Sequence, residues 1–265
     1  MSARNGRLAE RRIAVDGVQV YYRVSTRPVP PSRPPLLLVH GYGMSSRYMV
    51  PLAEALACDF RVYAPDLPGF GRSGKPKRVL DIPELADALA AWMNTLGLGP
   101  AVLIGNSLGC QVVVEVALRH GERVACLVLQ APTPDPAART ARQQILRQAL
   151  NLRHDATARM SGIALSDFLS AGPRRLLLTL RHLLRHPVED RLTQVRTPAL
   201  VLRGACDPVI SRAWARQAAE LLPQGRLIEV AGAAHIMNFH APERFARIVR
   251  RYVGLGPVSP ALVVQ

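Results

Sequence analysis

The stretch Ala101-Val102-Leu103-Ile104-Gly105-Asn106-Ser107-Leu108-Gly109 decides how this chain folds. Its first four residues are aliphatic and predict a strand buried on both faces, as in a parallel sheet. The G-x-S-x-G pattern at 105–109 predicts a tight turn into a helix at 108–119. A serine on such a turn has strained backbone and lies at the carboxyl edge of the sheet, at the positive end of the helix. The alternative interpretation is a loop serine that caps the helix.

Strand and helix patterns alternate on both sides of this turn. Short apolar runs recur at residues 36–39, 60–64, 125–130, 199–203 and 226–230. Helical patterns lie between most of them, at 46–57, 82–96, 212–222 and 242–253. Two alternating runs around Asp16-Gly17 add a predicted hairpin. This order predicts an α/β fold with a doubly wound, mostly parallel sheet.

Residues 133–195 interrupt the alternation, because they hold helical patterns but no clear strand. A simple crossover needs only about a dozen residues. We therefore predict a helical cap at 133–195, inserted into an α/β core formed by residues 1–132 and 196–265. At helical spacing, its apolar residues are expected mostly to pack against that core, with some lining a cavity. They include Met160, Ile163, Leu165, Phe168 and residues 176–178.

The composition excludes several classes of protein. The chain has 265 residues, of which 49% are hydrophobic, so it is too apolar for a disordered protein. Its longest aliphatic runs are strand-sized, which predicts no membrane insertion. No apolar stretch follows the basic start, so no signal peptide is expected. The four cysteines show no metal spacing and are expected to be free thiols in a reducing compartment, which indicates a cytoplasmic protein. They are Cys58, Cys110, Cys126 and Cys206.

A formal net charge of +15 raises the question of nucleic-acid binding. Only Lys75 and Lys77 are lysines among the 34 basic residues, and the arginines are spread along the chain without a run longer than two. Aromatic residues make up 5% and do not interleave with the arginines as stacking platforms would. We therefore expect no nucleic-acid partner, and a solvated basic surface that attracts anions.

A nucleophilic serine needs a base, and the base needs an orienting carboxylate. Asp207 follows one predicted strand and His235 follows the last one, so both lie at the same sheet edge as Ser107. These three residues are the candidate catalytic set. Asp135 is the alternative orienting carboxylate, and His240 is the alternative base.

Donors for a developing oxyanion are expected beside the serine. We assign the backbone N–H groups of Tyr42 and Leu108 to this role, and we expect His40 to brace the loop. Apolar residues next to the catalytic segments predict an apolar substrate pocket. Its candidate lining residues are Gly41, Met44, Val209, Ile210 and Met237.

Five motifs in order make a family resemblance plain. They are HGYG (40–43), DLPGFGRSG (66–74), GNSLGC (105–110), GACDPVI (204–210) and GAAHIMNFHAPERF (232–245). As a set they resemble the α/β-hydrolase superfamily, specifically its small capped esterase-like and carbon–carbon hydrolase-like members. The resemblance implies a Ser107 nucleophile, a His235 base, an Asp207 orienter, no metal and no organic cofactor. A serine nucleophile disfavours the haloalkane dehalogenase and epoxide hydrolase mechanisms.

The expected activity is hydrolysis of a carboxylic ester with a small to medium apolar acyl group, through an acyl-enzyme. The expected partner is this small-molecule substrate. Asn106 resembles the carbon–carbon hydrolases that cleave vinylogous diketones, but Ile236 stands where those enzymes commonly carry tryptophan. That reaction is therefore the second hypothesis. Thioester cleavage or acyl transfer would use the same residues, and a ligand receptor with little turnover is the alternative of another class.

Overall fold

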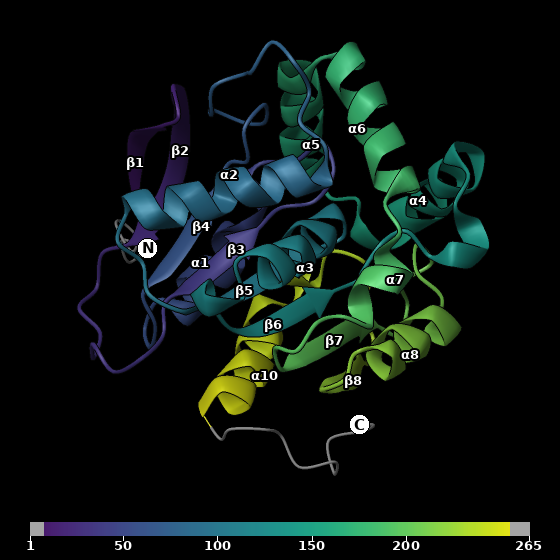
Figure 1. Cartoon of the computed structure of the whole chain (residues 1–265). Helices are drawn as coiled ribbons and strands as arrows, with labels where there is room; N and C mark the ends of the chain where they lie inside the picture. Colours follow the sequence, from purple (N-terminus) through teal and green to yellow (C-terminus); the bar gives the residue numbers. More distant parts are fainter. Residues whose placement is uncertain (1–7, 255–265) are drawn as a thin grey trace.

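An eight-stranded sheet forms the centre of the computed structural model, which describes residues 8–254 (Figure 1). The ends of the predicted core, residues 1–7 and 255–265, lie outside the described residues. The strand order is β1-β2-β4-β3-β5-β6-β7-β8. The strands are β1 (Leu8–Val15), β2 (Val18–Ser25), β3 (Leu36–Val39), β4 (Val62–Pro65), β5 (Ala101–Asn106), β6 (Val124–Gln130), β7 (Ala199–Gly204) and β8 (Gly225–Val230).

The sheet is antiparallel at one edge and parallel elsewhere. β1 pairs with β2, and β2 with β4, in antiparallel fashion, whereas every pair from β4 to β8 is parallel. Asp16 and Gly17 join β1 to β2 with φ of 47° and 78°, the conformation that a two-residue hairpin turn requires. The predicted hairpin and the predicted doubly wound, mostly parallel sheet are confirmed.

Helices cover both faces of the sheet. Residues of α2, α3 and α8 pack into one apolar core, and residues of α1 and α10 pack into the core on the other face. These helices are α1 (Val50–Leu56), α2 (Ile82–Thr95), α3 (Leu108–Arg119), α8 (Arg212–Leu221) and α10 (Pro242–Gly254). The shorter elements are α9 (Met237–His240) and 3-10 turns at Ser46–Met49, Gly121–Arg123 and Pro136–Ala138.

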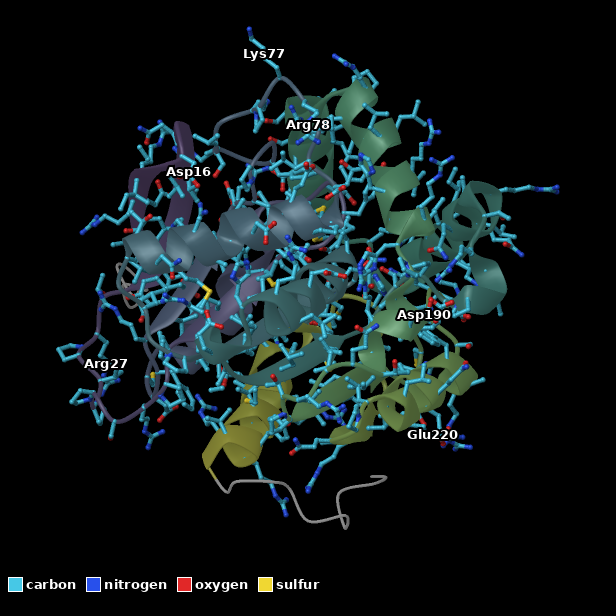
Figure 2. All side chains as sticks on the ribbon, in the orientation of Figure 1. Asp16, Arg27, Lys77, Arg78, Asp190 and Glu220 are labelled. Carbon is cyan, nitrogen blue, oxygen red and sulfur yellow. The ribbon has the colours of Figure 1, made fainter. Side chains whose placement is uncertain are left out.

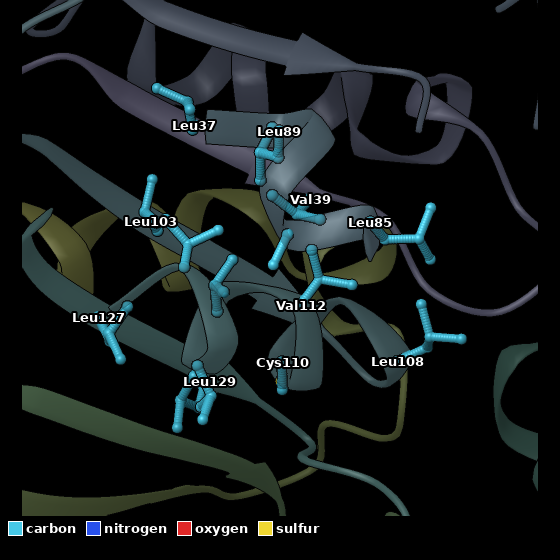
Figure 3. Packing of buried hydrophobic residues seen from close by; sticks show 14 of the residues in the cluster. Leu37, Val39, Leu85, Leu89, Leu103, Leu108, Cys110, Val112, Leu127 and Leu129 are labelled. Carbon is cyan, nitrogen blue, oxygen red and sulfur yellow. The ribbon is translucent and has the colours of Figure 1, made fainter. Parts of the chain in front are cut away.

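Alternate strand residues supply the two cores, because successive side chains on a strand point to opposite faces. On β5, Leu103 packs with Leu37 in the first core, whereas Ile104 packs in the second. Figure 3 shows Leu103 and Leu37 facing Leu89 of α2 and Val112 of α3. The central strand is therefore clamped between two helical layers.

Four helices lie between β6 and β7. They are α4 (Ala141–Asp155), α5 (Ala158–Ala171), α6 (Pro173–Arg185) and α7 (Val188–Leu192). Val188 and Leu192 are fully buried in the first core, which also contains α2, α3 and α8, so α7 belongs to that core. The other three helices contact loops at the carboxyl ends of strands. The expectation that their apolar side chains pack inward holds for Met160 and is wrong for Leu165 and Leu177, which are exposed.

Within residues 8–254, no helix combines the length and the apolar character that crossing a bilayer requires. The four cysteines are free thiols, and Cys110 is buried beneath the turn after β5. Burial raises the pKa of the Cys110 thiol well above its ordinary value. This thiol is therefore neutral at physiological pH, unlike the thiolate that a cysteine nucleophile needs.

Replacing Leu103 by alanine should lower the free energy of unfolding by about 2–5 kcal/mol, because a fully buried leucine leaves a cavity between two layers. The matched control is Leu152→Ala on the exposed side of α4, which should change stability by less than about 0.5 kcal/mol. Urea unfolding followed by circular dichroism measures both. Equal losses for the two variants would contradict this description of the core.

Candidate active site

Ser107 lies on a strained turn between β5 and α3. Its φ of 55° and ψ of −118° place a non-glycine residue in a region that L-residues rarely adopt. The turn is tight because a Cβ at Gly105 would lie 2.5 Å from the Gly109 carbonyl oxygen, and one at Gly109 would collide with the Val39 carbonyl. The Ser107 N–H donates to the Gln130 carbonyl at 3.0 Å, which ties the turn to the end of β6.

The Ser107 hydroxyl does not cap the helix that follows it. Ser107 is the N-cap residue of α3, yet its side chain makes no capping hydrogen bond, so the capping interpretation is wrong. Its Oγ lies 3.2 Å from Thr133 Oγ1, and either hydroxyl can donate. The hydroxyl is held instead by a side chain just beyond the end of β6.

His235 and Asp207 form a buried pair. His235 Nδ1 lies 2.9 Å from Asp207 Oδ2, and Asp207 Oδ1 accepts the Val209 N–H at 2.7 Å. Arg203 holds the aspartate loop, because its guanidinium donates to the Asp207 carbonyl at 2.9 Å and to the Ile210 carbonyl at 3.1 Å. A carboxylate only accepts, so Nδ1 carries the proton, and whenever the imidazole is neutral its Nε2 is an acceptor.

The environment of His235 suits a general base. Burial lowers the pKa of His235, but the charge of Asp207 and its hydrogen bond outweigh that effect, so the pKa is raised above its ordinary value. His235 Nε2 is buried and has no hydrogen-bond partner in the described structure. A buried nitrogen without a partner is costly unless a substrate or a hydroxyl group comes to it.

The backbone of His235 is fixed from two sides. Its carbonyl accepts hydrogen bonds from Gln130 Nε2 at 3.0 Å and from Asn106 Nδ2 at 3.3 Å, at the ends of β6 and β5. The next residue, Ile236, donates its N–H to Asp155 Oδ2 on α4 at 3.1 Å. The histidine is thus positioned by the sheet and by α4 together.

The predicted oxyanion donors lie in two different turns. Leu108 is the first residue of α3, where a backbone N–H has no acceptor within the helix. Tyr42 lies in a turn closed by the hydrogen bond from the Met44 N–H to the Gly41 carbonyl, at 3.2 Å. The Gly41 N–H already donates to Tyr48 Oη at 2.7 Å, so this neighbour is not available to a substrate. The oxyanion role of Tyr42 and Leu108 stays a prediction.

The predicted pocket residues are almost wholly buried. Val209 and Ile210 have no exposed surface and belong to the first core. Met44 and Met237 belong to the second core, on the other face of the sheet. A Cβ at Gly41 would lie 3.2 Å from Tyr48 Oη, so there is little room at that position. Their contact with a substrate stays a prediction.

The alternative catalytic residues have other partners. Asp135 accepts from Arg147 Nη1 at 2.7 Å and from the Ser211 N–H at 3.0 Å. His240 Nε2 lies 2.8 Å from the Asp155 carbonyl, to which it donates. His40 Nε2 accepts the Leu67 N–H at 2.9 Å, and burial lowers the pKa of this histidine, so it is a neutral brace for its loop.

Comparisons with known proteins show to which family this chain belongs. A family model described as the alpha/beta hydrolase family matches residues 36–248. The chain belongs to the alpha/beta hydrolase family. A pimeloyl-[acyl-carrier protein] methyl ester esterase of Aromatoleum aromaticum is 30% identical, over 84% of this chain and 99% of its own. A putative carbamate hydrolase of Serratia proteamaculans is 28% identical, over 83% of this chain and 90% of its own.

Solved structures show the same fold. An esterase from Thermogutta terrifontis is 24% identical with a TM-score of 0.75, over 93% of this hydrolase and 98% of that chain. A membrane phospholipase A described as a bacterial virulence factor is 22% identical with a TM-score of 0.78, over 92% and 85%. The curated relatives support a hydrolase that acts on ester-type bonds.

Sequence reasoning missed two residues of the site. Thr133 follows the end of β6 as Ser107 follows the end of β5, so the same rule of convergent strand ends could have found it. Asp155 carries no such signal, because it lies at the end of α4 and is far in sequence from any strand. Among residues 8–254, no three histidine, cysteine, aspartate or glutamate side chains are grouped so as to hold a metal ion.

Replacing Asp207 by asparagine should lower the pKa of His235. The substitution removes the larger of the two carboxylate charges that raise this pKa, Asp155 being the other, and leaves the burial that lowers it. The measurement is an NMR titration of the His235 ring, compared between the wild type and the variant. The matched control is Asp135→Asn, whose carboxylate pairs with Arg147, and it should leave the His235 titration unchanged. A titration that moves with Asp135 and not with Asp207 would contradict the assigned pair.

Proposed function

We propose that this chain is a serine hydrolase that cleaves a carboxylic ester with a small to medium apolar acyl group. The observation that carries the proposal is the Asp207–His235 hydrogen bond, which leaves a buried His235 Nε2 without a partner at the sheet edge that also holds Ser107. We further propose that residues 133–195 serve as the cap, with α4–α6 over the substrate.

In the first step, Ser107 Oγ turns from Thr133 toward His235 and gives its proton to Nε2. The oxygen attacks the acyl carbonyl, a C–O bond forms, and the carbonyl electron pair moves onto oxygen. The N–H groups of Tyr42 and Leu108 stabilise that oxyanion, aided by the positive end of α3. Asp207 stabilises the imidazolium by charge and by its hydrogen bond, without taking the proton.

In the following steps, the oxyanion collapses and the bond to the alcohol oxygen breaks. His235 gives its proton to this leaving oxygen, and the acyl group stays on Ser107. A water molecule then gives a proton to His235 Nε2 and attacks the acyl carbon. Breakage of the Ser107–acyl bond returns the proton to the serine and releases the acid, so the enzyme is restored.

The names of the relatives support the class of reaction. A methyl ester esterase and a carbamate hydrolase both act at a carbonyl carbon that carries an oxygen or nitrogen leaving group. The carbon–carbon hypothesis depends on the resemblance of Asn106 to a residue of those hydrolases. In this structure the Asn106 side chain accepts from Tyr48 Oη at 2.7 Å and donates to the His235 carbonyl. That asparagine is used within the protein.

Replacing Ser107 by alanine should reduce turnover on the order of 10⁴-fold or more, with the fold retained. The measurement is hydrolysis of p-nitrophenyl esters of rising acyl length, beside circular dichroism of both proteins. The preferred acyl length gives the size of the pocket. The matched control is Ser161→Ala on the exposed side of α5, which should keep wild-type turnover.

Unchanged turnover in Ser107→Ala would contradict the assignment of the nucleophile. A folded wild type that hydrolyses none of these esters would contradict the proposed esterase activity. Vinylogous diketones are then the next substrates to test. If the protein does not cleave these either, the result would favour a ligand receptor with the same fold.

A further inference from the structure

Exposed apolar side chains are concentrated on one part of this molecule. In the described chain, the large hydrophobic residues that remain exposed all lie on α4, α5 and α6. They are Ile145, Leu146, Leu150, Leu152, Leu165, Phe168, Leu169 and Leu177. Scattered single leucines on a surface are ordinary, but several on one helical hairpin, such as α5 with α6, indicate a surface that meets a partner or a lipid.

Three of these leucines lie where α5 and α6 form a projecting hairpin. Leu165 and Leu169 are one turn apart on α5, so they share a face, and they are 63% and 74% exposed. Leu177 lies near the start of α6 and is 68% exposed. In Figure 1, the turn between α5 and α6 stands at an outer end of the molecule.

A shallow hollow with four basic residues in its lining lies at the same turn. It has a volume of about 200 Å³, and its charged lining residues are Lys75, Lys77, Arg174 and Arg175. The loop and the hairpin are joined, because Lys75 Nζ donates to the Ser170 carbonyl and Arg175 Nη2 donates to the Pro76 carbonyl at 2.9 Å. Figure 2 shows Lys77 projecting from this end of the molecule.

The helices α4, α5 and α6 carry no exposed acidic residue. From Ala141 to Arg185 the only acidic residues are Asp155 and Asp167, and both are buried. Asp167 forms an ion pair with Arg47 at 2.9 Å and accepts a hydrogen bond from the Ser45 hydroxyl at 2.7 Å. Its charge is therefore balanced within the protein and does not face solvent. The hairpin therefore presents exposed leucines and exposed cations together.

We propose that this hairpin surface, formed by Leu165, Leu169, Leu177, Lys75, Lys77 and Arg174, docks on an anionic phospholipid bilayer. The leucines enter the boundary between head groups and acyl chains, while the cations meet lipid phosphates at and around the hollow. A projecting hairpin end can enter a fluid interface without matching a rigid surface. A second copy is disfavoured, because the same cations would face each other.

Docking on a bilayer goes beyond ester hydrolysis, since it uses none of the catalytic residues. The experiment is sedimentation of the full chain with phosphatidylcholine vesicles, with or without phosphatidylglycerol. We expect binding to the anionic vesicles only, and release when salt is raised, because salt screens exposed charges. Ser107→Ala should bind as the wild type does, which separates this test from that of the proposed hydrolase.

Two double variants test the surface itself. Leu169→Gln with Leu177→Gln removes apolar contact, and Lys77→Glu with Arg174→Glu reverses charge. Each should weaken partitioning about tenfold or more. All four side chains are exposed, so thermal unfolding should be close to that of the wild type.

Matched controls carry the same changes elsewhere. Ile145→Gln with Leu152→Gln alters two exposed residues of α4, which lies away from the α5–α6 turn in Figure 1. Arg27→Glu with Arg216→Glu makes the same change in net charge on other surfaces. Both controls should bind as the wild type does.

Three results would overturn the proposal. They are absence of binding to anionic vesicles, equal binding to neutral vesicles, and hairpin variants that bind like their controls. A parallel column of immobilised poly-glutamate tests an acidic polypeptide as the partner instead. Retention there that needs the cations but not the leucines, without vesicle binding, would replace the lipid by such a polypeptide.

Discussion

The left-handed backbone of Ser107 is the constraint on which the rest of the site depends. A non-glycine residue in such a conformation costs on the order of 1–3 kcal/mol, so the surrounding structure must enforce it. Gly105 and Gly109 allow β3, β5 and α3 to approach at backbone contact, and the bond from the Ser107 N–H to Gln130 joins the turn to β6. The two cores that clamp β5 stabilise the turn against relaxation.

The same sheet edge positions the histidine through its main chain. Gln130 and Asn106, which end β6 and β5, donate to the His235 carbonyl, while Asp207 bonds to the ring. Asp155 brings α4 into this arrangement by accepting the Ile236 N–H. The helices between β6 and β7 are therefore tied to the loop of the proposed base through α4.

Much of this architecture could be predicted, because it follows from local rules. The aliphatic run before Ser107 indicated a buried strand, and strands that run parallel bring Asp207 and His235 to the same edge. The contact of the Ser107 hydroxyl with Thr133 could not be predicted, since a rotamer depends on neighbours distant in sequence. Helical spacing locates the apolar residues of α5 but does not show what surrounds each of them. It therefore predicts that Leu165 packs inward, whereas this side chain is exposed.

The proposed reaction depends above all on Ser107 as the nucleophile, activated by His235. The most direct test is to treat the folded protein with a fluorophosphonate, which forms an oxygen–phosphorus bond to an activated serine and releases fluoride. Intact mass and peptide mapping then locate the adduct. We expect one adduct per chain, on Ser107, and none in a His235→Ala variant. An adduct on another residue, or equal labelling without His235, would contradict it.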